Sequence, residues 1–154
     1  MSAPAPTPRQ SLRAGLPAAT GIALNVLSVV AILVQCYGLY RPDGPPAPAW
    51  LPYADKWGHL LGFALPVALV LITIHWWTGV VTRRAQSLVV IAFGAQAVLS
   101  ELVQGHGALA GRSGDVVDLA ADALGIALGC ALAAFLTPRI FRNRPGRRDG
   151  KHKA

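Results

Sequence analysis

Charged residues are scarce in this sequence, and their scarcity argues against an ordinary soluble domain. Only 14% of the 154 residues are Asp, Glu, Lys or Arg, whereas 53% are hydrophobic. Soluble domains contain about 25% charged residues. Acidic residues are the fewest, with seven against 14 Lys and Arg, which leaves a formal net charge of +7. The composition therefore favours a membrane protein.

Cysteine is almost absent, which excludes the cysteine-based classes of site. Cys36 and Cys130 are the two cysteines, and each falls in an apolar stretch far from the other. This spacing is not that of a paired-cysteine metal site, and we expect both cysteines to be buried small hydrophobic residues. The sequence also contains no phosphate-binding loop, no HExxH motif and no serine nucleophile elbow. The better-known enzyme classes therefore have no support in the sequence.

Long apolar stretches are what the chain does have, and they define its fold class. They cover about residues 18–40, 57–77, 85–104 and 115–137. Each is close to the ~20 residues that a helix needs to cross a bilayer. We predict an all-α membrane protein, a bundle of four transmembrane helices forming one domain over residues 18–137. Residues 1–17 are expected to form a disordered arm, and residues 138–154 a basic tail.

The positions of Lys and Arg predict how this bundle sits in the membrane. Eleven of the fourteen lie in the N-terminal arm, the second loop and the C-terminal tail, which an even number of spans places on one side. Cytoplasmic segments retain Lys and Arg, so both termini are expected in the cytoplasm of a multi-pass protein of the cytoplasmic membrane. The basic tail suits anionic lipid headgroups, and we expect membrane lipids rather than nucleic acid as partners.

A polar stripe on the last span is the most unusual feature of the sequence. Asp115, Asp118, Asp122, Gly125 and Gly129 follow one another at steps of three or four residues. That spacing places them on one face of a helix, acidic at its start and made of glycine further along. Buried carboxylates are rare in membrane spans and mark functional sites.

The second and third spans place polar residues at the same outer membrane boundary. Asp55, suited to cap the second helix, is followed by His59 one turn later, and Glu101 and Gln104 end the third span. Lys56 and Arg112 lie at the rim. We therefore predict one shared ligand-binding site whose five carboxylates exceed its two fixed cations by three charges. Its candidate residues are Asp55, Lys56, His59, Glu101, Gln104, Arg112, Asp115, Asp118 and Asp122.

These residues, in this order, resemble the signature of the VanZ-like family of small bacterial membrane proteins. The resemblance covers Asp55 to Gly129 and includes the glycine steps after Asp122. Asp122 is a departure, because the family commonly has asparagine there, and the site is more acidic for it. The resemblance implies a protein of the bacterial cytoplasmic membrane, in a family named for a member linked to resistance to the glycopeptide teicoplanin. It implies no defined reaction.

Several functions fit the predicted site. The first is binding of a cell-envelope lipid or lipid precursor at the outer leaflet. The second is a small hydrolase or transferase in which Glu101 or Asp118 acts as the base and His59 as an acid or metal ligand. A divalent cation at such a site would be Mg²⁺ or Mn²⁺ rather than zinc. The remaining alternatives are a structural polar network and a proton-linked carrier. The sequence leaves the ligand, any cofactor and the oligomeric state open.

Overall fold

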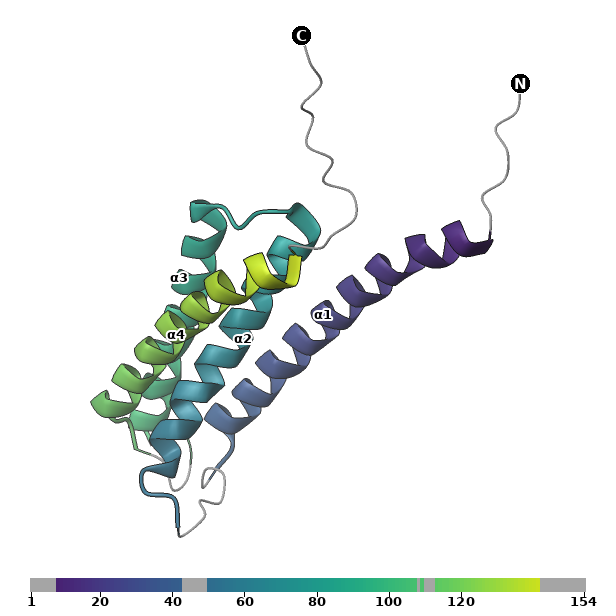
Figure 1. Ribbon diagram of the computed structural model, residues 1–154. Coiled ribbons are helices and arrows are strands. Elements are labelled where there is room, and N and C mark those ends of the chain that lie inside the picture. Colours follow the sequence, from purple (N-terminus) through teal and green to yellow (C-terminus); the bar gives the residue numbers. More distant parts are fainter. Residues whose placement is uncertain (1–7, 43–49, 108, 110–112, 142–154) are drawn as a thin grey trace, which may run out of the picture.

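The computed structural model shows an all-helical protein (Figure 1). It describes residues 8–42, 50–107, 109 and 113–141, and within these ranges the regular elements are four α-helices. They are α1 (Pro8–Tyr40), α2 (Ala54–Thr78), α3 (Arg83–Gly105) and α4 (Val116–Phe141). All four are long and apolar enough to cross a membrane. The all-helical class and the four membrane-spanning helices are therefore as predicted.

Two helix boundaries differ from the sequence expectation. Helix α1 begins at Pro8, so residues 8–17, expected to be disordered, continue the helix toward its N-terminal end. Proline is well suited to a first helical position because the N–H it lacks would have no helical partner there. Helix α4 continues through Pro138 to Phe141, where the tail was expected to begin. A proline in the last turn removes only one hydrogen bond. The remainder of the arm and tail, 1–7 and 142–154, lies outside the described residues.

The closest helix pairing joins α2 to α4. A Cβ atom added at Gly129 would lie 2.6 Å from the carbonyl oxygen of Ala64 and 2.8 Å from the Cβ of Val67. At Gly125 an added Cβ would collide with the carbonyl oxygen of Leu60. The glycine face of α4 is therefore pressed against the backbone of α2, as small-residue membrane interfaces allow. We call this contact the α2–α4 interface.

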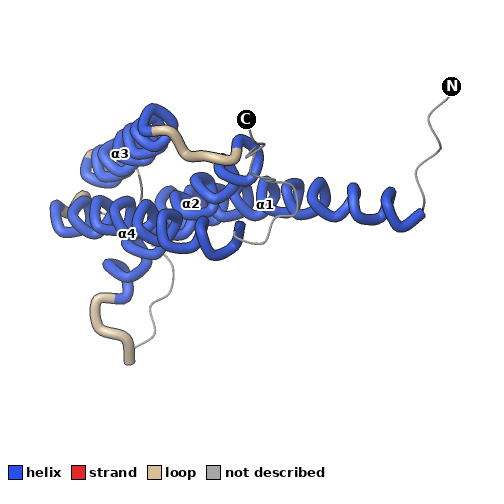
Figure 2. The backbone as a smooth tube through the Cα atoms, turned by 45° about the horizontal axis from the view of Figure 1, so that its top comes forward, coloured by secondary structure: helices blue, strands red, loops and turns tan. Residues whose placement is uncertain are grey.

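Helix α3 completes the core from the side, and Figure 2 shows it as a separate rod beside α2 and α4. The rings of Phe63 on α2 and Phe93 on α3 meet edge to face, with centroids 6.3 Å apart. Val67, Ala97 and Ile126 are buried around this pair. The apolar core thus lies among α2, α3 and α4.

Helix α1 is attached to the bundle mainly through α2. Ser28 on α1 lies within hydrogen-bonding distance of Thr73 on α2, with 3.0 Å between the hydroxyl oxygens. Most large apolar side chains of α1 are exposed, among them Val30, Leu33 and Val34. Such a surface is unfavourable in water and suits hydrocarbon chains. Helix α1 therefore lies at the edge of the bundle.

Candidate functional site

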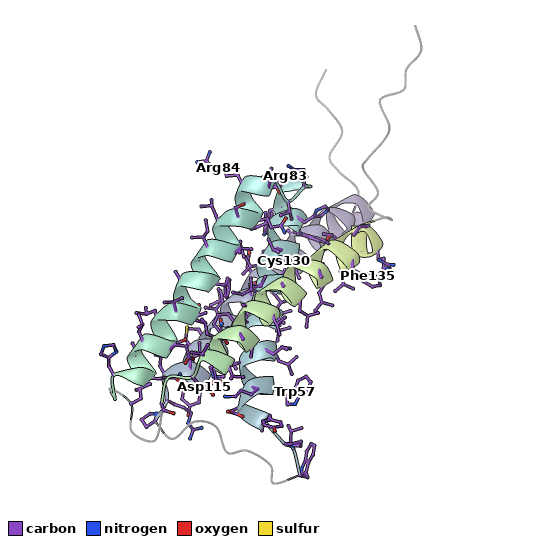
Figure 3. All side chains as sticks on the ribbon, turned by 90° about the vertical axis from the view of Figure 1, so that its left-hand side faces the viewer. Trp57, Arg83, Arg84, Asp115, Cys130 and Phe135 are labelled. Atoms are coloured by element: carbon purple, nitrogen blue, oxygen red, sulfur yellow. The ribbon has the colours of Figure 1, made fainter. Side chains whose placement is uncertain are left out.

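The predicted polar residues gather at one end of the bundle, where α2 and α4 begin and α3 ends. Figure 3 shows Trp57 and Asp115 at this end, with Arg83 and Arg84 at the opposite end. We call the side chains that meet here the polar cluster. It consists of Asp55, Lys56, His59, Glu101, Asp115, Asp118 and Asp122.

The α2–α4 interface positions the most deeply buried part of the polar cluster. Asp122 precedes Gly125 by three residues, so the close helix contact at Gly125 also carries Asp122 against α2. There His59 Nδ1 lies 2.8 Å from Asp122 Oδ1. His59 is 5% exposed and Asp122 is fully buried. The glycine steps in the sequence therefore set the distance between an imidazole and a carboxylate from two helices.

The other ring nitrogen of His59 faces a second carboxylate. His59 Nε2 lies 3.8 Å from Asp118 Oδ2, which is too long for a hydrogen bond. Asp118 is buried, and its other oxygen, Oδ1, lies 2.6 Å from Lys56 Nζ. One imidazole is thus placed between two aspartates of α4 that are one helical turn apart.

Lys56 is the cation at the rim of the polar cluster. Its ammonium lies 2.6 Å from Asp115, 2.6 Å from Asp118 and 3.1 Å from Asp55. The hydrogen bond from Lys56 holds the pKa of the Asp115 carboxyl below its usual range, and the bond that Asp115 accepts from the Val117 N–H acts in the same direction. Asp115 therefore caps α4 as a carboxylate. Lys56 ties the start of α4 to the start of α2.

The capping role predicted for Asp55 is wrong. The residue at the cap position of α2 is Tyr53, which has a left-handed backbone and makes no side-chain cap bond. Asp55 lies in the first turn of the helix, where a carboxylate faces the positive end of the helix dipole. It contacts Lys56 rather than His59, and its side chain is 57% exposed. Asp55 is thus a rim residue.

Glu101 reaches the polar cluster from the end of α3. Its Oε2 accepts a hydrogen bond of 2.7 Å from the backbone N–H of Asp115. This approach needs glycine at position 114, where an added Cβ would lie 2.9 Å from the carbonyl oxygen of Glu101 and 3.1 Å from the Cα of Gly105. The other oxygen, Oε1, is buried and meets no hydrogen-bond partner among the described residues. One atom each from His59, Glu101 and Asp118 lie within 4.8 Å of one another.

One predicted ligand-binding residue, Gln104, stands apart from this cluster, and another lies outside the described residues. Gln104 is buried and donates from Nε2 to the carbonyl oxygen of Leu39, at 2.9 Å. It therefore ties the end of α3 to the end of α1 rather than pairing with a charged side chain. Arg112 lies outside the described residues.

A groove between α1 and α2 was not predicted from the sequence. It has a volume of about 990 Å³, and apolar residues of both helices, including Val30, Val34 and Leu65, form its walls. Lys56, His59, Asp115 and Asp118 line it at the polar cluster. We call it the α1–α2 groove. The apolar part of the α1–α2 groove thus leads to the polar cluster.

Gln35 is a further polar residue of this groove that sequence reasoning did not place in the site. It lies on α1, is 5% exposed, and neither its amide nitrogen nor its amide oxygen meets a hydrogen-bond partner within the described ranges. Opposite it on α2 lies Gly62, whose added Cβ would be 4.0 Å from the Gln35 Cγ. A buried amide of this kind in a membrane span was the available signal, because such a group costs free energy unless it is paired.

The fold and the cluster together are those of a multi-pass membrane protein with a buried polar His and Asp cluster near one end of its helices. No family model, no curated protein and no solved structure matches the chain. The resemblance to the VanZ-like family stays a prediction made from the residues.

Proposed function

We propose that this protein binds a cell-envelope lipid or lipid-linked precursor. Its headgroup would lie at the polar cluster and its hydrocarbon chain in the α1–α2 groove. The observation that supports this function best is that the groove has an apolar part and a polar end. Its walls are apolar along both helices, and Lys56, His59 and Asp118 line it at one end. A lipid likewise has an apolar hydrocarbon chain and a polar headgroup. Its chain would replace other lipid chains that contact the membrane helices, so little solvation free energy would be lost.

The proposed headgroup lies at the outer leaflet. Among the described residues, Arg83, Arg84 and Arg139 lie at the helix ends opposite the polar cluster. Positive charge favours the cytoplasmic side, so the cluster would face outward. The VanZ-like resemblance points in the same direction, toward the cytoplasmic membrane of a bacterium.

The charges of the cluster favour a headgroup that donates hydrogen bonds. The polar cluster holds five carboxylates, Asp55, Glu101, Asp115, Asp118 and Asp122, and one cation, Lys56, which already contacts three of them. Arg41 also lines the groove, and its guanidinium lies over the ring of Tyr37. Carboxylates accept hydrogen bonds and attract positive charge. Amino groups and sugar hydroxyls are therefore suited to this end of the groove. The unpaired amide of Gln35 offers a further contact about 7.5 Å below the end of α1, at 1.5 Å per residue.

Filling the groove tests the proposal. Gly62→Leu places a side chain into the groove, and Gly94→Leu is the matched control, because Gly94 lies on α3 with no atom within 4 Å of an added Cβ. Native mass spectrometry of gently extracted protein should show bound lipid in the parent and in Gly94→Leu. In Gly62→Leu we expect at least a tenfold lower affinity, or about 1.4 kcal/mol. Equal lipid retention in both variants, or none in the parent protein, would contradict the proposal.

The resemblance to the VanZ-like family adds a proposed role in glycopeptide resistance. Expression in a susceptible bacterium should raise its tolerance of teicoplanin, and Asp118→Asn should remove the effect while the protein still reaches the membrane. Unchanged susceptibility on expression of the parent protein would remove this role and leave lipid binding to be judged by mass spectrometry.

A second candidate function is a small membrane hydrolase or transferase, which the His59–Asp122 contact favours. A buried aspartate that accepts from one ring nitrogen orients the imidazole and raises the basicity of the other nitrogen. His59 also lines the groove in which a substrate would lie. An enzyme would convert an added lipid, and His59→Gln would stop the conversion without loss of bound lipid. A pure binding protein would leave the added lipid unchanged.

A further inference from the structure

Beyond lipid binding, we infer that His59, Glu101 and Asp118 hold one divalent cation. The three residues come from α2, α3 and α4, and each brings one ligand atom to within 4.8 Å of the other two. The inference concerns the polar cluster alone and stands whether or not a lipid occupies the groove.

The three ligand atoms lie near one another, but not yet at the distances of a bound cation. With metal–ligand bonds of ~2.1 Å, ligands of an octahedral ion are separated by about 3.0 Å when adjacent and 4.2 Å when opposite. His59 Nε2 and Asp118 Oδ2 are 3.8 Å apart, between these two values. This pair is too distant for a hydrogen bond and close enough for a metal bridge. Side-chain movements of up to about 1 Å would bring the ligand atoms to these separations.

The partners of the three residues leave the required atoms available. Lys56 engages Oδ1 of Asp118, and the Asp115 N–H engages Oε2 of Glu101. Oε1 of Glu101 remains, buried and with no hydrogen-bond partner in the part of the chain that the structure describes. A buried carboxylate oxygen without a donor is costly, and a cation would satisfy it.

Asp122 provides the independent observation that points to a metal. Asp122 is fully buried. Its Oδ1 lies 2.8 Å from His59 Nδ1, whereas its Oδ2 has no hydrogen-bond partner within the described ranges. Metal-binding histidines almost always donate their second ring N–H to a carboxylate or carbonyl, which fixes the ring and leaves the lone pair on the other nitrogen. With the proton on Nδ1, the lone pair of Nε2 is directed to the side on which Asp118 lies.

The ligand types indicate which cation would bind. Two carboxylates and one imidazole suit Mn²⁺ and Mg²⁺, which prefer oxygen donors and keep water in their remaining positions. Two positive charges would also offset much of the charge excess of five carboxylates over Lys56. The proposal therefore concerns a Mn²⁺- or Mg²⁺-type site.

Manganese provides a direct test with a spectroscopic readout. Chelator-treated, delipidated full-length protein in detergent is titrated with Mn²⁺, and the free ion is followed by electron paramagnetic resonance. We expect saturable binding of one ion per chain, with a pulsed-resonance coupling to an imidazole nitrogen. Glu101→Gln and Asp118→Asn should each weaken binding by at least ~100-fold, and Asp122→Asn by about 10- to 100-fold, because it only orients His59.

Asp55→Asn is the matched control for charge. It removes one carboxylate of the rim but no proposed ligand, so the affinity should fall by no more than ~3-fold, which is the long-range effect of one exposed charge. Glu101→Gln retains an oxygen that can accept from Asp115, so its helical circular dichroism should equal that of the parent protein. The inference is overturned by absence of saturable binding, by absence of nitrogen coupling, or by equal losses in Asp55→Asn and Asp118→Asn. Since the lipid has been removed, none of these outcomes bears on the groove.

Discussion

Glycines lie at the contacts of α2 with both α4 and α1, yet the contact with α4 is closed and the one with α1 is open. Toward α4, Gly125 and Gly129 of the facing helix leave no room for a single added carbon. Toward α1, α2 itself presents Gly58 and Gly62, and atoms added there would meet nothing closer than 4.0 Å. The first pair makes the α2–α4 interface and the second pair helps to line the α1–α2 groove.

The difference shows that glycine in a membrane helix has two structural uses. A glycine face brings two backbones together where the partner helix lies parallel to it and close. The same lack of a side chain leaves a cavity where the partner stands away. The closed interface fixes the distances within the polar cluster, whereas the open groove gives a ligand access to it. Substitutions on the two sides should therefore have different effects.

The largest effect is expected at the closed interface. Gly129→Val would force carbon atoms into the Ala64 carbonyl and the Val67 side chain. Overpacking against a backbone that cannot move costs about 3 kcal/mol or more, so the variant should express poorly or melt well below the parent protein in detergent. Gly94→Val is the control, because an added Cβ at Gly94 meets no atom within 4 Å. If both variants melt at the same temperature, the α2–α4 contact is looser than described.

A smaller effect is expected at the attachment of α1. Ser28→Ala removes the contact between the hydroxyls of Ser28 and Thr73, which is a polar link of α1 to α2. Side-chain hydrogen bonds between membrane helices contribute about 0.6 kcal/mol on average. The melting temperature should therefore change by a few degrees at most. A loss as large as that of Gly129→Val would mean that α1 is as firmly held as α4, and the comparison of the two sides would fail.

The smallest effect concerns pH at the entrance of the closed interface. The pKa of Asp115 is lowered in the folded protein by Lys56, so its ionised form stabilises the fold above the usual aspartate pKa of about 3.9. That stabilisation is lost as the pH falls through the lower folded value. The difference in melting temperature between the parent and Asp115→Asn should therefore be full at pH 6 and shrink below about pH 4. A difference that is independent of pH would show that Asp115 is not stabilised as a carboxylate.

Much of the fold could be predicted from local sequence patterns. The apolar stretches predicted four spans, and the three- and four-residue steps predicted that Asp118, Asp122, Gly125 and Gly129 share a face, which the structure has against α2. Both depend on properties of a single helix, its length and its 3.6-residue repeat. The helix limits at Pro8 and Phe141 were missed, because proline near a helix end is compatible with either outcome.

The contacts among the polar residues could be predicted from the sequence only in part. The sequence placed His59, Glu101 and Asp118 at the same membrane boundary, and the structure brings them within 4.8 Å. The helical spacing of Asp55 and His59 predicted only that they lie one turn apart on α2, and the structure gives them different partners: Asp55 meets Lys56 and His59 meets Asp122. Spacing along one helix cannot reveal a nearer partner on another helix.

The sequence by itself determined a helical membrane protein with an acidic, histidine-containing end, because hydropathy and helical periodicity act within each segment. Only the tertiary structure decided that Asp122 orients His59, that Gln104 binds the backbone of α1, and that a groove runs between α1 and α2. These features depend on how closely separate helices approach one another. The close approach of α4 to α2 depends on the absence of side chains at Gly125 and Gly129, whereas α1 leaves open space beside Gly58 and Gly62 of α2.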